Sequence, residues 1–192
     1  MKRTVGRFVV RALRYRIEGG PPPADPVCVL VGAPHTSWLD FPLMLGIAWA
    51  NGLSPHFLAK QEMFRPPFGA VMRGLGGLPV DRQNPGPLVA DLVARASAGE
   101  PLALVVAPEG TRGHGTHWKS GFYRIAEEAK VPIALTYLDG PTRTGGFGPC
   151  LRPSGDVRAD MDLVRAFYAD KRGVRPERRT PAVLREEGPD AP

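Results

Sequence analysis

A histidine and an aspartate, His35 and Asp40, lie five positions apart directly after a short apolar run. Inside one helix the two side chains would point about 140° apart, so they can meet only if His35 lies in a loop before the helix. Pro34 fits such a loop, and Ser37 is a suitable N-cap that would place Asp40 in the first helical turn. An aspartate in that position can orient an imidazole that removes a proton from a hydroxyl. The structural alternative is that Asp40 complements the helix dipole beside an ordinary loop histidine.

A second polar cluster, Glu109-Gly110-Thr111-Arg112, follows another apolar run later in the chain. Gly110 permits close approach to the backbone. Arg112 and Lys119 supply positive charge, and a helix predicted from Ser120 supplies free N–H groups for an anion. The structural alternative is a strand-to-helix loop with solvated charges. A proton acceptor combined with anion-binding cations suggests a hydroxyl made nucleophilic beside a bound phosphate, and we therefore predict acyl transfer.

Two further groups carry weaker signals. The segment 76–82 is a glycine-rich turn that leads to Arg82, and a surface turn at Asp81 and Arg82 is its structural alternative. His114 and His117 have a spacing found in metal sites, but no nearby cysteine or carboxylate completes such a site. We interpret these two histidines as loop residues.

The elements that must position these residues follow from the hydrophobic pattern. Apolar, β-branched runs predict strands at 27–31, 56–59, 78–80, 102–107 and 133–138, and helical spacing predicts helices at 37–51, 63–77, 88–98, 120–130 and 160–171. Strands that alternate with helices predict an α/β fold with a mostly parallel central sheet flanked by helices. Ligands bind outside the carboxyl ends of the strands in such sheets, so both polar clusters are expected at one edge.

The two ends of the chain differ from the middle. Residues 1–17 predict a basic amphipathic helix, which either packs on the domain through a narrow apolar stripe or lies on anionic lipid. Residues 173–192 are rich in proline and charge, and we expect a disordered tail. A single folded domain over residues 1–172 is the expected organisation.

Composition limits the possible classes of protein. The chain has 192 residues, of which 43% are hydrophobic and 23% charged, as in a globular domain. A net charge of +6 predicts an anionic partner. The basic run at 171–179 lacks interleaved aromatic residues, so we expect no nucleic-acid binding. Two cysteines imply no disulfide framework, and neither a membrane-spanning run nor a secretory signal is readable.

Four motifs then appear in a recognisable order. They are H-x4-D at His35 and Asp40, G-x-x-x-V-D-R ending at Arg82, E-G-T-R from Glu109 to Arg112, and V-P-I at 131–133. Roughly residues 27–138 closely resemble the glycerolipid acyltransferase family, whose best-known members acylate lysophosphatidate. The resemblance implies that His35 is a general base oriented by Asp40. It also implies acceptor-binding roles for Arg82, Glu109, Gly110, Thr111, Arg112 and Lys119.

The resemblance further implies the partners of the protein. The acyl donor would be a thioester of coenzyme A or of acyl carrier protein, the acceptor a lysophospholipid such as 1-acylglycerol-3-phosphate, and no metal or cofactor would be needed. A peripheral enzyme on an anionic surface, at the cytoplasmic face of the cell membrane, is expected. The chain departs from the family's usual motifs at Pro34, Pro79, Ala107 and Leu135. A non-catalytic lipid-surface binding protein and a thioesterase-like hydrolase are the alternatives on the same fold.

Overall fold

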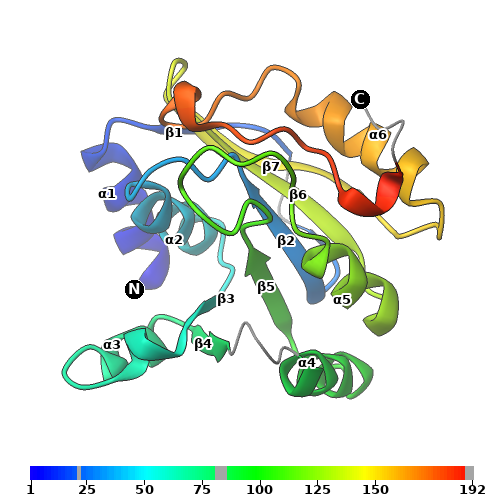
Figure 1. The fold of residues 1–192 in the computed structure, drawn as a ribbon. Coiled ribbons are helices and arrows are strands. Elements are labelled where there is room, and N and C mark those ends of the chain that lie inside the picture. The colour runs from blue at the N-terminus through cyan, green and yellow to red at the C-terminus, as the bar shows by residue number, and fades with distance from the viewer. Residues whose placement is uncertain (21–22, 81–85, 189–192) are drawn as a thin grey trace.

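A seven-stranded sheet forms the centre of the protein in the computed structural model, which describes residues 1–20, 23–80 and 86–188 (Figure 1). The strand order is β1-β7-β6-β2-β5-β3-β4. The strands are β1 Arg16–Ile17, β2 Val27–Ala33, β3 Pro55–Lys60, β4 Gly77–Val80, β5 Leu102–Val106, β6 Ile133–Asp139 and β7 Thr144–Leu151. The five strands from β2 to β6 pair with one another in parallel, whereas β7 runs antiparallel to β6. The predicted α/β fold with a mostly parallel sheet is confirmed.

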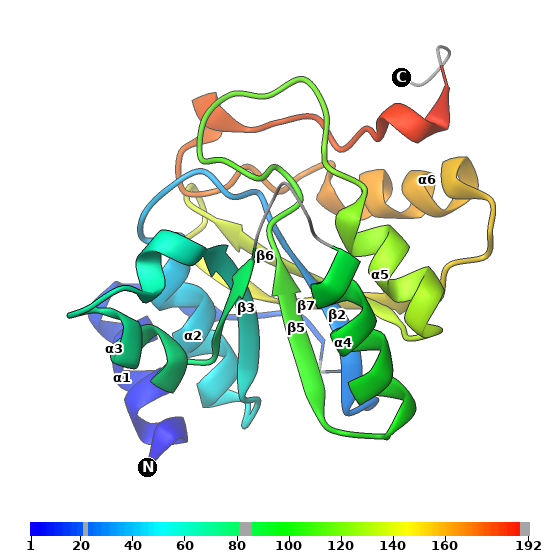
Figure 2. The same ribbon diagram turned by 60° about the horizontal axis from the view of Figure 1, so that its bottom comes forward.

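Within the described ranges, six α-helices cover the two faces of this sheet (Figures 1 and 2). They are α1 Lys2–Ala12, α2 Asp40–Ala50, α3 Gly69–Gly74, α4 Gly86–Ser97, α5 Gly121–Ala129 and α6 Val157–Tyr168. Side chains of β2 alternate between the two cores: Val29 and Val31 pack towards α4, α5 and α6, whereas Cys28 and Leu30 pack towards α1, α2 and α3. Burial on both faces explains why β2 is a continuous apolar run.

The N-terminal helix is shorter than predicted. It ends at Ala12, Arg14 adopts a left-handed φ of 60°, and β1 then pairs with β7. The helix packs on α2 at very close range, since a Cβ atom at Gly6 would lie 2.5 Å from the carbonyl oxygen of Gly46. Phe8 nevertheless remains 71% exposed, so the helix also presents an apolar side chain to its surroundings.

The expectation of a disordered tail is wrong for residues 173–188, which pack against the domain. Gly173 forms a bridge with Asp139, and Leu184 forms one with Trp118. Leu184 is 1% exposed and belongs to the core beneath α5 and α6, together with Ala182. Burial of these apolar residues orders the segment. The many prolines and charges around them hide this signal in the sequence. Residues 189–192 lie outside the described part.

Three local predictions are also corrected. The segment 63–77 is not one helix: Pro66 and Pro67 separate a 3-10 turn at Gln61–Phe64 from α3. Strand β7 is present where no strand was predicted, because its glycines weaken the strand pattern. Helix α2 begins at Asp40 rather than at Ser37. Within the described residues, no helix has the length and apolarity needed to cross a bilayer.

Candidate active site

The two polar clusters meet at one edge of the sheet. Strands β2 and β5 are parallel neighbours with Val31 opposite Val106, so the loops that follow them leave the sheet side by side. Figure 1 shows the long loop after β5 lying over this edge, next to the loop after β2. The convergence expected from the sequence is therefore present.

His35 and Asp40 contact each other directly. The imidazole Nδ1 of His35 lies 3.1 Å from Oδ2 of Asp40. The same oxygen accepts the backbone N–H groups of Thr36 at 2.7 Å and Ser37 at 2.8 Å. These bonds curl residues 36–39 into a turn, in which the Ser37 hydroxyl accepts the N–H of Leu39 instead of capping α2. Asp40 is 4% exposed, so the aspartate is a fixed, buried orienting group for the ring.

Glu109 reaches the same loop from the other side. Its Oε2 accepts the backbone N–H of His35, and the side chain is 4% exposed. Burial raises the pKa of Glu109 to about 8, and Asp40 adds to this, while the His35 N–H and Arg179 act in the opposite direction. The carboxyl group therefore faces the backbone of the histidine loop rather than solvent.

Arg112 lies against Trp38. Its guanidinium carbon is 3.7 Å from the centre of the indole ring, whose residue is 73% exposed. The Nε atom of Arg112 is buried and has no hydrogen-bond partner among the described residues. Burial lowers the pKa of Arg112, and nearby Asp40 raises it. A cation stacked on an aromatic face, with a spare donor atom, is suited to an anionic ligand.

Gly110 lies beneath the side chain of Lys119. A Cβ atom at this position would be 2.8 Å from Cε of Lys119, and the φ of Gly110 is +67°. The left-handed backbone favours glycine here, whereas the flexible end of the Lys119 side chain could move aside for a Cβ atom. Thr111 and Lys119 are exposed, and the Thr111 hydroxyl accepts the N–H of Gly113 at 3.3 Å. Lys119 is therefore held at the surface of the same loop as Arg112.

Arg82, the remaining predicted site residue, lies outside the described residues. His114 and His117 do not meet: Nδ1 of His114 contacts the carbonyl of Arg179 and Nδ1 of His117 contacts Thr116. No group of three or more potential metal ligands occurs in residues 1–20, 23–80 and 86–188.

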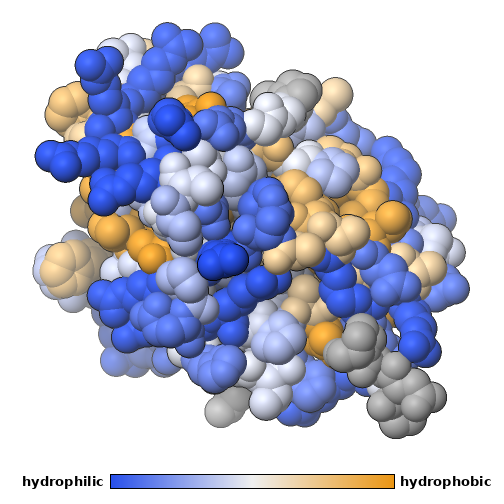
Figure 3. All heavy atoms as spheres, turned by 90° about the horizontal axis from the view of Figure 1, so that it is seen from above, coloured by the Kyte–Doolittle hydropathy of each residue, from blue (hydrophilic) through white to orange (hydrophobic). Residues whose placement is uncertain are grey.

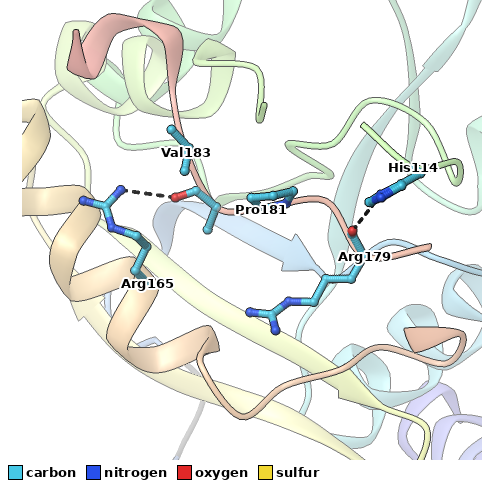
Figure 4. A pocket seen from close by; sticks show the side chains of 6 residues that line it. His114, Arg165, Arg179, Pro181 and Val183 are labelled. Carbon is cyan, nitrogen blue, oxygen red and sulfur yellow. Dashed lines mark hydrogen bonds between the residues drawn. The ribbon is translucent and has the colours of Figure 1, made fainter. Parts of the chain in front are cut away.

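A hollow of about 430 Å³ lies beside the C-terminal segment (Figure 4). Its lining residues are His114, Arg165, Arg179, Pro181, Ala182 and Val183. The Arg165 guanidinium donates to the Ala182 carbonyl at 3.3 Å. Neither His35 nor Asp40 lines this hollow, and its polar groups are occupied in holding the chain together.

Sequence reasoning missed two features of the site. Trp38 was not assigned, although a tryptophan inside the H-x4-D stretch is itself a signal. The C-terminal segment was also missed: the Arg175 N–H donates to the Thr36 hydroxyl at 3.0 Å, and the Gly115 N–H donates to the Thr180 hydroxyl at 3.0 Å.

Seen from above in Figure 3, the left half of this side of the molecule is largely hydrophilic, and hydrophobic atoms gather on the right.

Comparisons with known proteins identify the family to which the chain belongs. The sequence model of the Acyltransferase family matches residues 21–136. The chain is 31% identical over 126 residues to the 1-acyl-sn-glycerol-3-phosphate acyltransferase of Bacillus subtilis, covering 62% of this chain and 59% of that protein. It is 32% identical over 127 residues to the enzyme of the same name from Streptococcus pneumoniae, covering 66% of this chain and 47% of that protein.

A solved structure shares the fold. The 1-acyl-sn-glycerophosphate acyltransferase PlsC from Thermotoga maritima superposes with a TM-score of 0.56 at 19% identity, covering 79% of this chain and 66% of that one. The chain spans about half the length of the two bacterial relatives described above. The resemblance seen in the motifs is confirmed, and the chain belongs to the acyltransferase family.

Proposed function

We propose that the protein is an O-acyltransferase that moves a fatty acyl group from an acyl thioester to a hydroxyl of a lysophospholipid such as 1-acylglycerol-3-phosphate. The observation that carries the proposal is the 3.1 Å contact between Nδ1 of His35 and a buried oxygen of Asp40. Because that oxygen is an acceptor, the Nδ1 atom carries the proton and Nε2 is left to act as the base.

In this mechanism the acceptor hydroxyl is bound next to Nε2 of His35. The imidazole takes the hydroxyl proton while the hydroxyl oxygen attacks the thioester carbonyl carbon. The carbon–sulfur bond then breaks, and the departing thiolate takes the proton back from His35. The products are the ester and a free thiol, and Asp40 stabilises the imidazolium that forms between the two steps.

Arg112 and Lys119 are the proposed ligands of the acceptor phosphate among the described residues. Arg112 offers a guanidinium whose buried Nε has no hydrogen-bond partner in the part of the chain that the structure describes, and Lys119 is an exposed cation on the same loop. Planar guanidinium groups bind phosphate through paired donors, whereas an ammonium acts as a point charge. Arg82 is part of the proposal through the family motif. The proposed donor is acyl-CoA or acyl carrier protein, and the chemistry requires no metal or cofactor.

We also place the protein peripherally on the cytoplasmic face of the cell membrane. Helix α1 supports this placement, since it exposes Val5 and Phe8 and carries Lys2, Arg3, Arg7 and Arg11. Apolar burial and attraction to anionic lipid act together for such a helix. The Gly6–Gly46 contact attaches the helix firmly to α2, so membrane binding through α1 would hold the whole domain at the surface.

Product analysis by mass spectrometry tests the proposal. The purified protein is incubated with acyl-CoA or acyl carrier protein thioester, and with 1-acylglycerol-3-phosphate, its dephosphorylated counterpart or no acceptor. We expect phosphatidate, free thiol and a strong preference for the phosphorylated acceptor. Release of free fatty acid without regard to acceptor would indicate a thioesterase-like hydrolase, and an unchanged thioester in every reaction would indicate a non-catalytic binding protein.

A further inference from the structure

The backbone N–H groups of three successive residues, His35, Thr36 and Ser37, are all held by buried carboxyl groups. Asp40 accepts the second and third of them. Glu109, which lies 74 positions from His35 along the chain, accepts the first. The loop that carries the imidazole is therefore fixed from both sides, by one carboxyl group of its own segment and one from the loop that follows the neighbouring strand β5.

The reach of Glu109 follows from the topology. Because β2 and β5 are parallel neighbours in register, the segments beyond Val31 and Val106 leave the sheet at the same edge. Glu109 extends sideways into the histidine loop, and the left-handed backbone of Gly110 then turns the chain away. The arrangement places the glutamate side chain behind His35, within the protein.

We propose that Glu109 is a positioning residue that fixes the backbone of His35, and that it is not a ligand of the acceptor. This inference rests on the proposed function, in which His35 is the base. Asp40 sets the orientation of the imidazole ring, and Glu109 sets the position of the backbone from which the ring projects. A base must lie within hydrogen-bond reach of the proton it removes, so both constraints affect the rate.

The surroundings of Glu109 favour this role over contact with substrate. The second oxygen, Oε1, is buried, and the backbone of Thr180 also hydrogen-bonds to the carboxyl group. With its raised pKa of about 8, the group is mostly protonated at neutral pH. A neutral carboxyl group still accepts the His35 N–H through its carbonyl oxygen. It also avoids placing a second negative charge beside Asp40.

Two substitutions of similar size separate the roles. Glu109→Gln keeps an acceptor oxygen, and Glu109→Met fills a comparable volume without one. We expect Glu109→Gln to retain kcat within about 3-fold. Glu109→Met should lower kcat on the order of 10²-fold, the cost of a displaced reacting group. The KM for the phosphorylated acceptor should stay within about 2-fold in both variants. The exposed Glu100, which pairs with Arg95, supplies the control substitutions Glu100→Gln and Glu100→Met.

A second measurement is independent of activity. The ring Nδ1–H of His35, bonded to Asp40, is followed by proton NMR and identified by its absence in His35→Ala. Glu109→Gln should preserve this resonance, and Glu109→Met should weaken or shift it. Wild-type protein without transferase activity would refute the proposed function and leave this spectral test intact. A raised acceptor KM with unchanged kcat, full kcat in Glu109→Met, or an inactive but folded Glu109→Gln would each overturn the positioning role. Should Glu109→Met not fold, the Glu109→Gln result decides alone.

Discussion

The guanidinium of Arg112 lies 3.7 Å above the indole ring of Trp38. The two residues come from different clusters, since Trp38 follows β2 and Arg112 follows β5. The exposed indole covers one face of the cation, and Asp40 lies close enough to raise the pKa of the same guanidinium. Trp38 thus connects the proposed phosphate ligand to the loop of the proposed base.

Removal of the indole should weaken acceptor binding. A cation–π contact contributes about 0.5–2 kcal/mol, so Trp38→Ala is expected to raise the KM for a phosphorylated acceptor by about 2- to 30-fold. Trp38→Phe keeps an aromatic face and should have a smaller effect, and Arg112→Ala a larger one. Steady-state kinetics in which acceptor and donor are varied separately decide the matter. An effect on the donor KM alone would disprove the assignment.

The stability of the protein should depend on the ionisation of Glu109. Its pKa rises from an ordinary value of 4.5 to about 8 in the folded state. The folded state therefore binds the Glu109 proton more tightly than the unfolded state does, and the bound proton stabilises the fold. This contribution to stability is complete below pH 4.5 and is lost as pH rises through 8. As pH rises from 5 to 8.5, the free energy of unfolding of the wild type should fall by a few kcal/mol relative to that of Glu109→Gln. The expected size is on the order of 1.4 kcal/mol per unit of pKa difference between the folded and unfolded states.

Urea unfolding of both proteins at pH 5 and pH 8.5 provides the measurement. The comparison cancels the titration of groups common to the two proteins. A difference between wild type and Glu109→Gln that stays constant over this range would show that Glu109 ionises normally.

The exposed side chains of α1 should control membrane binding. Full burial of a large apolar side chain contributes about 1.5–3 kcal/mol, so the double substitution Val5→Ser and Phe8→Ser is expected to weaken vesicle binding about 10-fold or more. Sedimentation with vesicles of mixed neutral and anionic lipid measures this, with and without high salt. Leu163→Ser on α6 is the control, because Leu163 is 60% exposed on another helix. Equal losses in both variants would argue against a specific contribution of α1.

The ordered C-terminal segment should be necessary for stability. Leu184 is fully buried against Trp118 and the helices of that face. Truncation of a buried leucine costs about 2–5 kcal/mol, so Leu184→Ala should lower the free energy of unfolding by that amount. Leu163→Ala should change it by less than about 0.5 kcal/mol. A disordered segment would make the two substitutions indistinguishable by urea denaturation.

Much of the fold could be predicted from the sequence because strands and helices with strong hydrophobic patterns alternate. The end of β2 before His35 and the end of β5 before Glu109 also predicted the edge at which the clusters meet. Element boundaries were less accurate. Asp40 accepts the N–H groups of Thr36 and Ser37, and this local turn delays the start of α2 beyond the residue that helix-capping preferences favour.

The remainder depends on contacts that no local pattern encodes. The Glu109 carboxyl group binds a backbone N–H, and residue type alone does not tell whether a glutamate in this motif faces ligand or protein. The three apolar residues at 182–184 are too few for a periodic pattern. Glycines at 145, 146 and 148 hide the strand that accompanies β6.

The most direct test of the account is the turnover of His35→Ala. Loss of a general base costs on the order of 10²–10⁴ in rate, so purified His35→Ala should form phosphatidate at least about 10²-fold more slowly while its circular dichroism and melting curve match wild type. His117→Ala, at an exposed histidine of the loop after β5, is the matched control and should retain activity. Near wild-type turnover in folded His35→Ala would contradict the account, because the His35–Asp40 pair would then not be the centre of the reaction.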